Sequence, residues 1–162
     1  MKFLEKDLED VIFSADKEML AQRGLEIEGK LLRQIRLGNY GVCDLLEIIK
    51  PSYLPHSKYH TPFIVTIYEL KKEQISMSSF LQCIRYGKAI QSYFEKRGFE
   101  VNIYFNLIGK TIDLNSDLIY LVDFMDNLYF YTYEYEFDGI RFKNHNNYTL
   151  SNEGFSNSKL PF

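Results

Sequence analysis

Residues 63–70 are apolar almost without interruption, and this run constrains the fold more than any other feature of the sequence. A strand of this kind is buried on both faces, which is typical of the centre of a sheet covered by helices. Residues 76–96 then show helical spacing of apolar side chains, and residues 101–108 alternate as a second strand. A strand, a long helix and a strand in this order form one crossover unit. The sequence therefore predicts an α/β fold. Gly87, on the apolar side of the helix, predicts close packing against the sheet.

The remaining patterns extend this unit on both sides. They predict an amphipathic opening helix at residues 3–20 and two antiparallel strands, 25–37 and 42–49, joined by a Gly/Asn turn. A proline-rich loop is expected at residues 51–62 and a short helix at residues 115–125. Residues 128–142 are expected to form a strand that enters a hairpin at Asp138-Gly139. We expect a mixed β-sheet flanked by helices in one domain over residues 1–145. A polar, poorly ordered tail is expected over residues 146–162.

Composition limits the classes of function. A formal net charge of −3 and a pI near 5.6 argue against a protein that coats nucleic acid through its overall field. The apolar stretches are too short to span a bilayer and the N-terminus lacks the order of a signal peptide, so we expect a cytoplasmic protein with no membrane contact. Cys43 and Cys83 lie in separate apolar segments, which predicts two reduced, buried thiols.

Three charged residues lie in or directly after these apolar strands. Asp44 lies in the run 42–49, and Glu69 and Lys71 lie near the end of the run 63–70. Side chains two apart in a strand share a face, so Glu69 and Lys71 are expected to point the same way. Carboxylates in a dry strand would take up protons unless a cation or an ammonium keeps them ionised. Two carboxylates with an ammonium beside them suit a hard divalent cation and phosphodiester hydrolysis.

These segments resemble the PD-(D/E)xK nuclease superfamily, in particular the NucS-like endonuclease domains. The resemblance covers roughly residues 3–142 and rests on four segments: Glu5-Lys6-Asp7-Leu8-Glu9, Gly41-Val42-Cys43-Asp44-Leu45-Leu46, Tyr68-Glu69-Leu70-Lys71 and Gln82-Cys83-Ile84-Arg85-Tyr86. It implies a restriction-endonuclease-like fold and a metal-dependent endonuclease that cleaves DNA with Mg²⁺ or Mn²⁺. Full NucS enzymes also have a separate DNA-recognition domain, which the resemblance does not cover, so it leaves substrate selection open.

The resemblance also assigns roles to individual residues. Asp44 and Glu69 would be metal ligands, and Lys71 would position the water and stabilise developing negative charge. Glu5 would complete the metal shell, with Glu9 as its rival. The substrate-binding residues would be Gln82, Tyr86, Arg85 and Gln34.

Other readings of the sequence stay open. A catalytically silent nuclease-fold module that binds nucleic acid or protein is the alternative to an enzyme. The aromatic row at odd positions from Tyr129 to Phe137 favours an inward sheet face or a homodimer contact over base stacking. His56 and His60 lack further zinc ligands nearby and are interpreted as loop histidines. A group of basic residues flanks the expected site and is either a solvated helix face or a phosphate contact. The group consists of Lys71, Lys72, Arg85, Lys88, Lys96 and Arg97.

Overall fold

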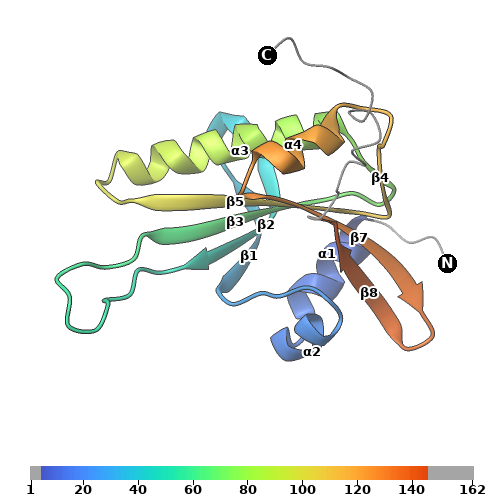
Figure 1. Ribbon diagram of the computed structural model, residues 1–162, viewed down its shortest axis with the longest axis horizontal. Helices are drawn as coiled ribbons and strands as arrows, with labels where there is room; N and C mark the ends of the chain where they lie inside the picture. The colour runs from blue at the N-terminus through green and yellow to red at the C-terminus, as the bar shows by residue number, and fades with distance from the viewer. Residues whose placement is uncertain (1–4, 146–162) are drawn as a thin grey trace, which may run out of the picture.

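The computed structural model describes residues 5–145, in which a six-stranded mixed sheet lies between two groups of helices (Figure 1). The strand order is β1-β2-β3-β5-β7-β8, antiparallel at both edges and parallel from β3 to β7. The strands are β1 (Lys30–Arg36), β2 (Val42–Ile49), β3 (Phe63–Leu70), β5 (Val101–Gly109), β7 (Leu128–Glu136) and β8 (Gly139–Asn144). The short strands β4 (Gln74–Ile75) and β6 (Thr111–Ile112) form a separate pair. The helices are α1 (Glu5–Ser14), α2 (Lys17–Gln22), η1 (Gly38–Tyr40), α3 (Met77–Glu95) and α4 (Leu118–Phe124).

The predicted crossover unit is confirmed. Strand β3 is buried from Val65 to its end at Leu70 and pairs in parallel with β5, and α3 forms the connection between them. Helix α3 begins at the Ser76 cap, whose side chain and that of Ser79 satisfy each other's backbone N–H groups. The close packing expected at Gly87 is also present, because a Cβ atom there would lie 2.7 Å from the ring of Phe105. The sheet therefore has the α/β class and the helical cover that the sequence predicted.

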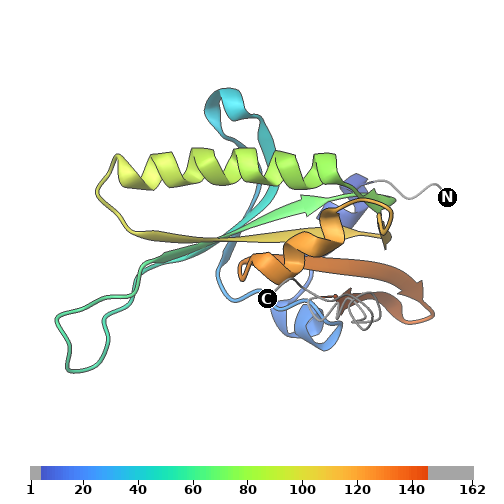
Figure 2. The ribbon, with the colours of Figure 1, turned by 45° about the horizontal axis from the view of Figure 1, so that its top comes forward.

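Each face of the sheet has its own hydrophobic core. Helices α3 and α4 cover one face, and α1 and α2 lie against the other (Figures 1 and 2). The α3-side core contains Val65 and Ile67 of β3, whereas Tyr68 and Leu70 of the same strand belong to the α1-side core. This alternation is what a period of two dictates for a strand buried on both faces.

The single opening helix expected over residues 3–20 was wrong. Two helices occupy this region, because Asp16 caps α2 with side-chain bonds to the backbone N–H groups of Glu18 and Met19. An aspartate that bonds the backbone in this way favours a new helix start over helix continuation. Residues 3 and 4 of the predicted helix lie outside the described residues.

The aromatic row on β7 does not form a single inward face. Tyr133 is 4% exposed and belongs to the α1-side core, whereas Tyr135 is 54% exposed and Phe137, beyond the strand end, is fully exposed. The row leaves the core where the β7–β8 hairpin extends past α1 (Figure 1). The prediction of an inward face therefore holds for only part of the row. The predicted tail, residues 146–162, lies outside the described residues.

Three smaller expectations can be compared directly with the structure. Cys43 and Cys83 are free and buried, as predicted. The proline-rich segment forms a loop between β2 and β3, closed by a bridge between Tyr53 and His60, and it includes His56. Figure 1 shows this loop at the end of the sheet opposite β4. In the described part of the chain, no helix has both the length and the apolar character needed to cross a membrane.

Candidate active site

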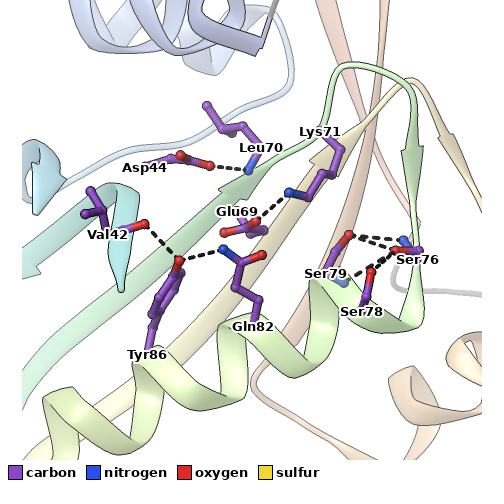
Figure 3. A network of polar contacts seen from close by, with 10 residues as sticks. All are labelled: Val42, Asp44, Glu69, Leu70, Lys71, Ser76, Ser78, Ser79, Gln82 and Tyr86. Atoms are coloured by element: carbon purple, nitrogen blue, oxygen red, sulfur yellow. Dashed lines mark hydrogen bonds and ion pairs between the residues drawn. The ribbon is translucent and has the colours of Figure 1, made fainter. Parts of the chain in front are cut away.

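Asp44, Glu69 and Lys71 lie together where β2 and β3 separate (Figure 3). The Lys71 Nζ atom lies 2.8 Å from Oε1 of Glu69, so the expectation that these two side chains point the same way is confirmed. Asp44 Oδ2 accepts a hydrogen bond of 3.1 Å from the backbone N–H of Leu70, the residue between them. The structure thus brings the three predicted central residues into one polar cluster at the carboxyl end of β3. In open α/β sheets, ligands bind at this end of the strands.

Asp44 lies outside the ladder that joins β2 to β3. The pairing between these strands runs from Ile49–Ile64 to Leu45–Tyr68 and does not include Asp44. The Asp44 carboxylate instead reaches the backbone of β3 one residue beyond Glu69. A side chain that bonds the neighbouring backbone in place of the ladder marks the point at which two strands diverge.

Burial makes Glu69 the most perturbed carboxyl of the cluster. Its side chain is 2% exposed. Burial, reinforced by the negative charge of Asp44, raises the pKa of Glu69 to about 7, although the hydrogen bond from Lys71 opposes this shift. Glu69 is therefore close to half-ionised near neutral pH. A cation bound beside Glu69 would offset the free-energy cost of its buried negative charge.

The pKa values of Asp44 and Lys71 are also shifted by burial and by their neighbours in the cluster. Burial raises the pKa of Asp44, and the hydrogen bond from Leu70 and the charge of Lys71 only partly offset this effect. For Lys71, burial lowers the pKa, but the hydrogen bond and charge of Glu69 outweigh burial, so the pKa lies above its usual value. Lys71 therefore stays protonated. With both carboxylates ionised, the cluster carries one negative charge in excess.

The raised pKa of Glu69 predicts a pH dependence of stability. The folded protein holds the Glu69 proton up to a pKa of about 7, whereas the unfolded chain releases it near 4.5. Between these values the folded state binds more protons, so the free energy of unfolding should fall as pH rises. At about 1.36 kcal/mol per pH unit, the contribution lost is on the order of 3 kcal/mol. Asp44 acts in the same direction. Lys71 does not titrate in this window.

Urea unfolding at pH 5 and pH 8, without divalent metal, measures this effect. The wild-type protein should lose roughly 2–3 kcal/mol more stability between the two pH values than a Glu69→Gln variant. Glu73→Gln is the matched control, because the side chain of Glu73 is 65% exposed, and it should behave like the wild type. Equal losses in the wild type and in Glu69→Gln would contradict the assignment.

Gln82 and Tyr86 are joined to each other and to β2. Gln82 Nε2 donates to the Tyr86 hydroxyl over 2.6 Å, and this hydroxyl donates to the carbonyl oxygen of Val42 over 2.8 Å (Figure 3). Tyr86 is only 2% exposed and belongs to the α3-side core, although the resemblance implies that it contacts the substrate. The hydroxyl of Tyr86 therefore ties α3 to β2 two residues before Asp44. Gln82 is half-buried and lies nearer to the cluster.

Glu9 and Gln34, predicted as a rival ligand and a substrate contact, bind each other. Glu9 is 5% exposed, and its Oε1 accepts from Arg33 Nε at 2.8 Å while its Oε2 accepts from Gln34 Nε2 at 2.6 Å. Arg33 also pairs with Asp10. Both oxygens of Glu9 thus have donors from β1. The geometry gives Glu9 a role in holding α1 against β1 and leaves it less suited to act as a metal ligand.

Glu5 and Arg85 are both exposed. Glu5 opens α1, and its negative charge, together with the larger effect of burial, contributes to the raised pKa of Asp44 and of Glu69. Glu5 is therefore near the cluster. Arg85 lies on α3 next to Tyr86, and within residues 5–145 no hydrogen bond or ion pair joins it to the cluster. No group of three or more His, Cys, Asp or Glu side chains among the described residues is arranged to hold a metal ion.

Two groups were not predicted from the sequence, one that belongs to the cluster and one that holds α1 against β1. The first is the backbone N–H of Leu70, which carries no sequence signal because every residue except proline has this group. The second is Arg33, whose importance depends on its contact with α1, more than twenty residues away. The Ser76 cap at the start of α3, drawn in Figure 3, could have been found, since serines three apart before an apolar helix are typical of a helix start.

Comparisons with known proteins add no relative to this picture. No protein-family model, curated protein or solved structure that was compared with the chain matches it significantly.

Proposed function

We propose that this protein is a metal-dependent endonuclease with a restriction-endonuclease-like fold, which hydrolyses DNA phosphodiester bonds at Asp44, Glu69 and Lys71. The proposal rests on the chemistry of this cluster together with the resemblance of its sequence segments. The mixed α/β sheet is compatible with such a fold. Mg²⁺ or Mn²⁺ is the proposed cofactor.

The observation that carries the proposal is the excess of acidic over basic side chains at the cluster. Two carboxylates, one of them almost fully buried, share a single ammonium, and burial disfavours the charged form of both. A purely structural ion pair with Lys71 would need only one carboxylate. A divalent cation would bring the two carboxylates and Lys71 to a net positive charge, which suits an anionic substrate.

The donor set fits Mg²⁺ or Mn²⁺. Magnesium is usually held by one or two protein carboxylates, with waters and substrate phosphate oxygens completing its shell. Asp44 and Glu69 supply two carboxylates, so a third protein carboxylate is not required. When bound, the ion would polarise a phosphoryl oxygen and lower the pKa of the attacking water.

The protein's own residues supply the remaining functions. The Lys71 ammonium, held by Glu69, can position a water molecule and stabilise the negative charge that develops on the phosphate oxygens. Gln82, anchored by Tyr86, can donate to the substrate backbone beside the cluster. Arg85 and Lys88 are exposed on α3, where they can contact phosphates. DNA contact would then be local, in keeping with the net charge of −3.

One observation favours a second candidate, a catalytically silent module of the same fold. The β7–β8 hairpin exposes Tyr135 and Phe137, and exposed aromatic side chains are typical of protein contact surfaces. In this reading the hairpin would pair with a second copy or another protein, and the acidic cluster would bind no metal.

Calorimetric titration with Mn²⁺, combined with a cleavage assay, tests the two candidates. For an enzyme we expect Mn²⁺ binding that disappears in Asp44→Asn, and cleavage of single-stranded or duplex DNA that EDTA abolishes. Asp113→Asn, whose carboxylate accepts from the backbone N–H of Asn115 in the loop after β6, is the control and should bind Mn²⁺ normally. A wild-type protein that binds neither Mn²⁺ nor Mg²⁺ at millimolar concentration would contradict the enzyme and support the module. Cleavage unaffected by EDTA would contradict the metal-dependent mechanism.

A further inference from the structure

Gln34 adopts a backbone conformation that is unusual for its residue type. Its φ angle is +50°, and apart from glycines only Gln34 and His56 have a positive φ within residues 5–145. Residues other than Gly, Asn and Asp rarely adopt this left-handed conformation, because the Cβ atom of an L-residue crowds the following carbonyl oxygen. Gln34 lies between the register pairs Arg33–Leu45 and Ile35–Cys43, directly opposite Asp44. The strained residue and the candidate catalytic aspartate therefore face each other across β1 and β2.

Both strands change their alternation at this pair. In β1, Leu32 and Ile35 are three residues apart, yet both pack in the α3-side core. In β2, Cys43 and Leu46 are also three apart and also share the α3-side core. Residues three apart in a regular strand point to opposite faces. In each strand, the regular alternation of side chains between the two faces of the sheet is therefore interrupted, at Gln34 in β1 and at Asp44 in β2.

This interruption explains why the Asp44 carboxylate can reach the cluster. Leu45, its neighbour, packs in the α1-side core, while Cys43, two residues away from Leu45, packs on the other side. In a regular strand Cys43 and Leu45 would share a face. The irregularity lies at Asp44, whose carboxylate leaves the β2–β3 ladder and accepts from the N–H of Leu70.

The side chain of Glu9 holds Gln34 in its conformation. The Gln34 amide donates to Glu9 over 2.6 Å, and Arg33, the preceding residue, binds the other oxygen of the same carboxylate. Arg33 also lies over the ring of Phe13, 5.0 Å from its centroid. Side chains of α1 therefore contact two consecutive residues of β1 at the point where the strand is irregular. Strained backbone persists where its surroundings fix it in this way.

We propose that Gln34 and Glu9 are positioning residues: the left-handed turn of Gln34, held by Glu9, directs the Asp44 carboxylate out of the strand alternation and into the Glu69–Lys71 cluster. Their role in catalysis rests on the proposed function, whereas their effect on the placement of Asp44 does not. This inference differs from the roles that the resemblance implied, in which Gln34 would touch the substrate and Glu9 would bind metal.

Two substitutions of the same residue separate positioning from substrate contact. Gln34→Gly removes the side chain but adopts φ of +50° without strain, whereas Gln34→Ala removes the side chain and keeps the strain. For positioning, we expect the glycine variant to keep cleavage within about threefold of the wild type and the alanine variant to lose roughly tenfold or more. If Gln34 touches substrate, both variants would lose activity equally.

A readout that needs no activity tests the placement of Asp44 itself. The amide resonance of Leu70 in a ¹⁵N–¹H spectrum reports the hydrogen bond to Asp44, and Asp44→Ala supplies the reference for its loss. We expect this resonance to stay at its wild-type position in Gln34→Gly and to move towards the Asp44→Ala position in Gln34→Ala and Glu9→Gln. A Leu70 resonance that is unchanged in both Gln34→Ala and Glu9→Gln would overturn the proposal.

The two readouts also separate this inference from the proposed function. A wild-type protein without metal binding or cleavage, in which the Leu70 resonance nevertheless follows the expected pattern, would reject the endonuclease and retain the positioning of Asp44. Full cleavage in Gln34→Ala, or equal loss in the alanine and glycine variants, would reject the positioning role while leaving the endonuclease intact.

Discussion

A Glu69→Gln variant is expected to lose DNA cleavage by on the order of 10³-fold, while its fold remains intact. The amide keeps the size of the side chain and can still accept a hydrogen bond from Lys71, but it carries no charge to hold a divalent ion. Glu69 is 2% exposed and its pKa is raised to about 7, so its ionised form is costly without a cation. The same substitution should therefore flatten the pH dependence of stability, since an amide does not titrate.

Initial cleavage rates at saturating Mn²⁺ and circular dichroism spectra of both proteins measure these effects together. Glu73→Gln is the matched control, because Glu73 is a mostly exposed carboxylate only four residues away, and it should keep wild-type activity. Full cleavage by a folded Glu69→Gln protein would refute the proposed mechanism.

A Lys71→Met variant is expected to lose roughly 10²–10⁴-fold in cleavage, with little change in Mn²⁺ affinity. Methionine has a similar length and packs in the same half-buried space, but it offers no ammonium to the water or to the phosphate oxygens. Lys71 stays protonated because the hydrogen bond and charge of Glu69 outweigh the effect of burial, which by itself lowers the pKa. We therefore expect a loss in the chemical step and not in metal binding.

The neighbouring lysine supplies the control for this prediction. Lys72 is exposed to nearly the same extent as Lys71, and its Nζ atom lies 3.7 Å from Oε1 of the mostly exposed Glu73, so Lys72→Met should retain cleavage within a few-fold. Single-turnover rates and Mn²⁺ titrations of both variants give the comparison. Equal activity of the two variants, or a loss of Mn²⁺ binding in Lys71→Met, would contradict the role assigned to Lys71.

The central part of the fold and the core of the site were predictable for a local reason. The run 63–70 is short, apolar and rich in β-branched and aromatic residues, which favours a buried strand. The helical spacing after Ser76 and the alternation after residue 101 each have the period of one kind of element. The period of two also placed Glu69 and Lys71 on one face, as their ion pair confirms. The opening helix was mispredicted because the cap at Asp16 competes with a continuous apolar pattern.

Local sequence patterns could not predict the contacts of Tyr86, Glu9 and Gln34. The resemblance implies that Tyr86 contacts the substrate, whereas its hydroxyl donates to the carbonyl oxygen of Val42 in a distant strand. Glu9 appears as one of several acids on α1 until Arg33 and Gln34 bind it. These contacts join residues more than twenty positions apart, so no spacing rule reports them.

The sequence by itself determined the strand–helix–strand unit and the shared face of Glu69 and Lys71, because backbone periodicity is a local property of the chain. Only the tertiary structure decided how Asp44 reaches them. Its direction depends on a left-handed residue in the neighbouring strand, held by a carboxylate from a helix, and such a conformation is stable only when the surrounding contacts offset its strain.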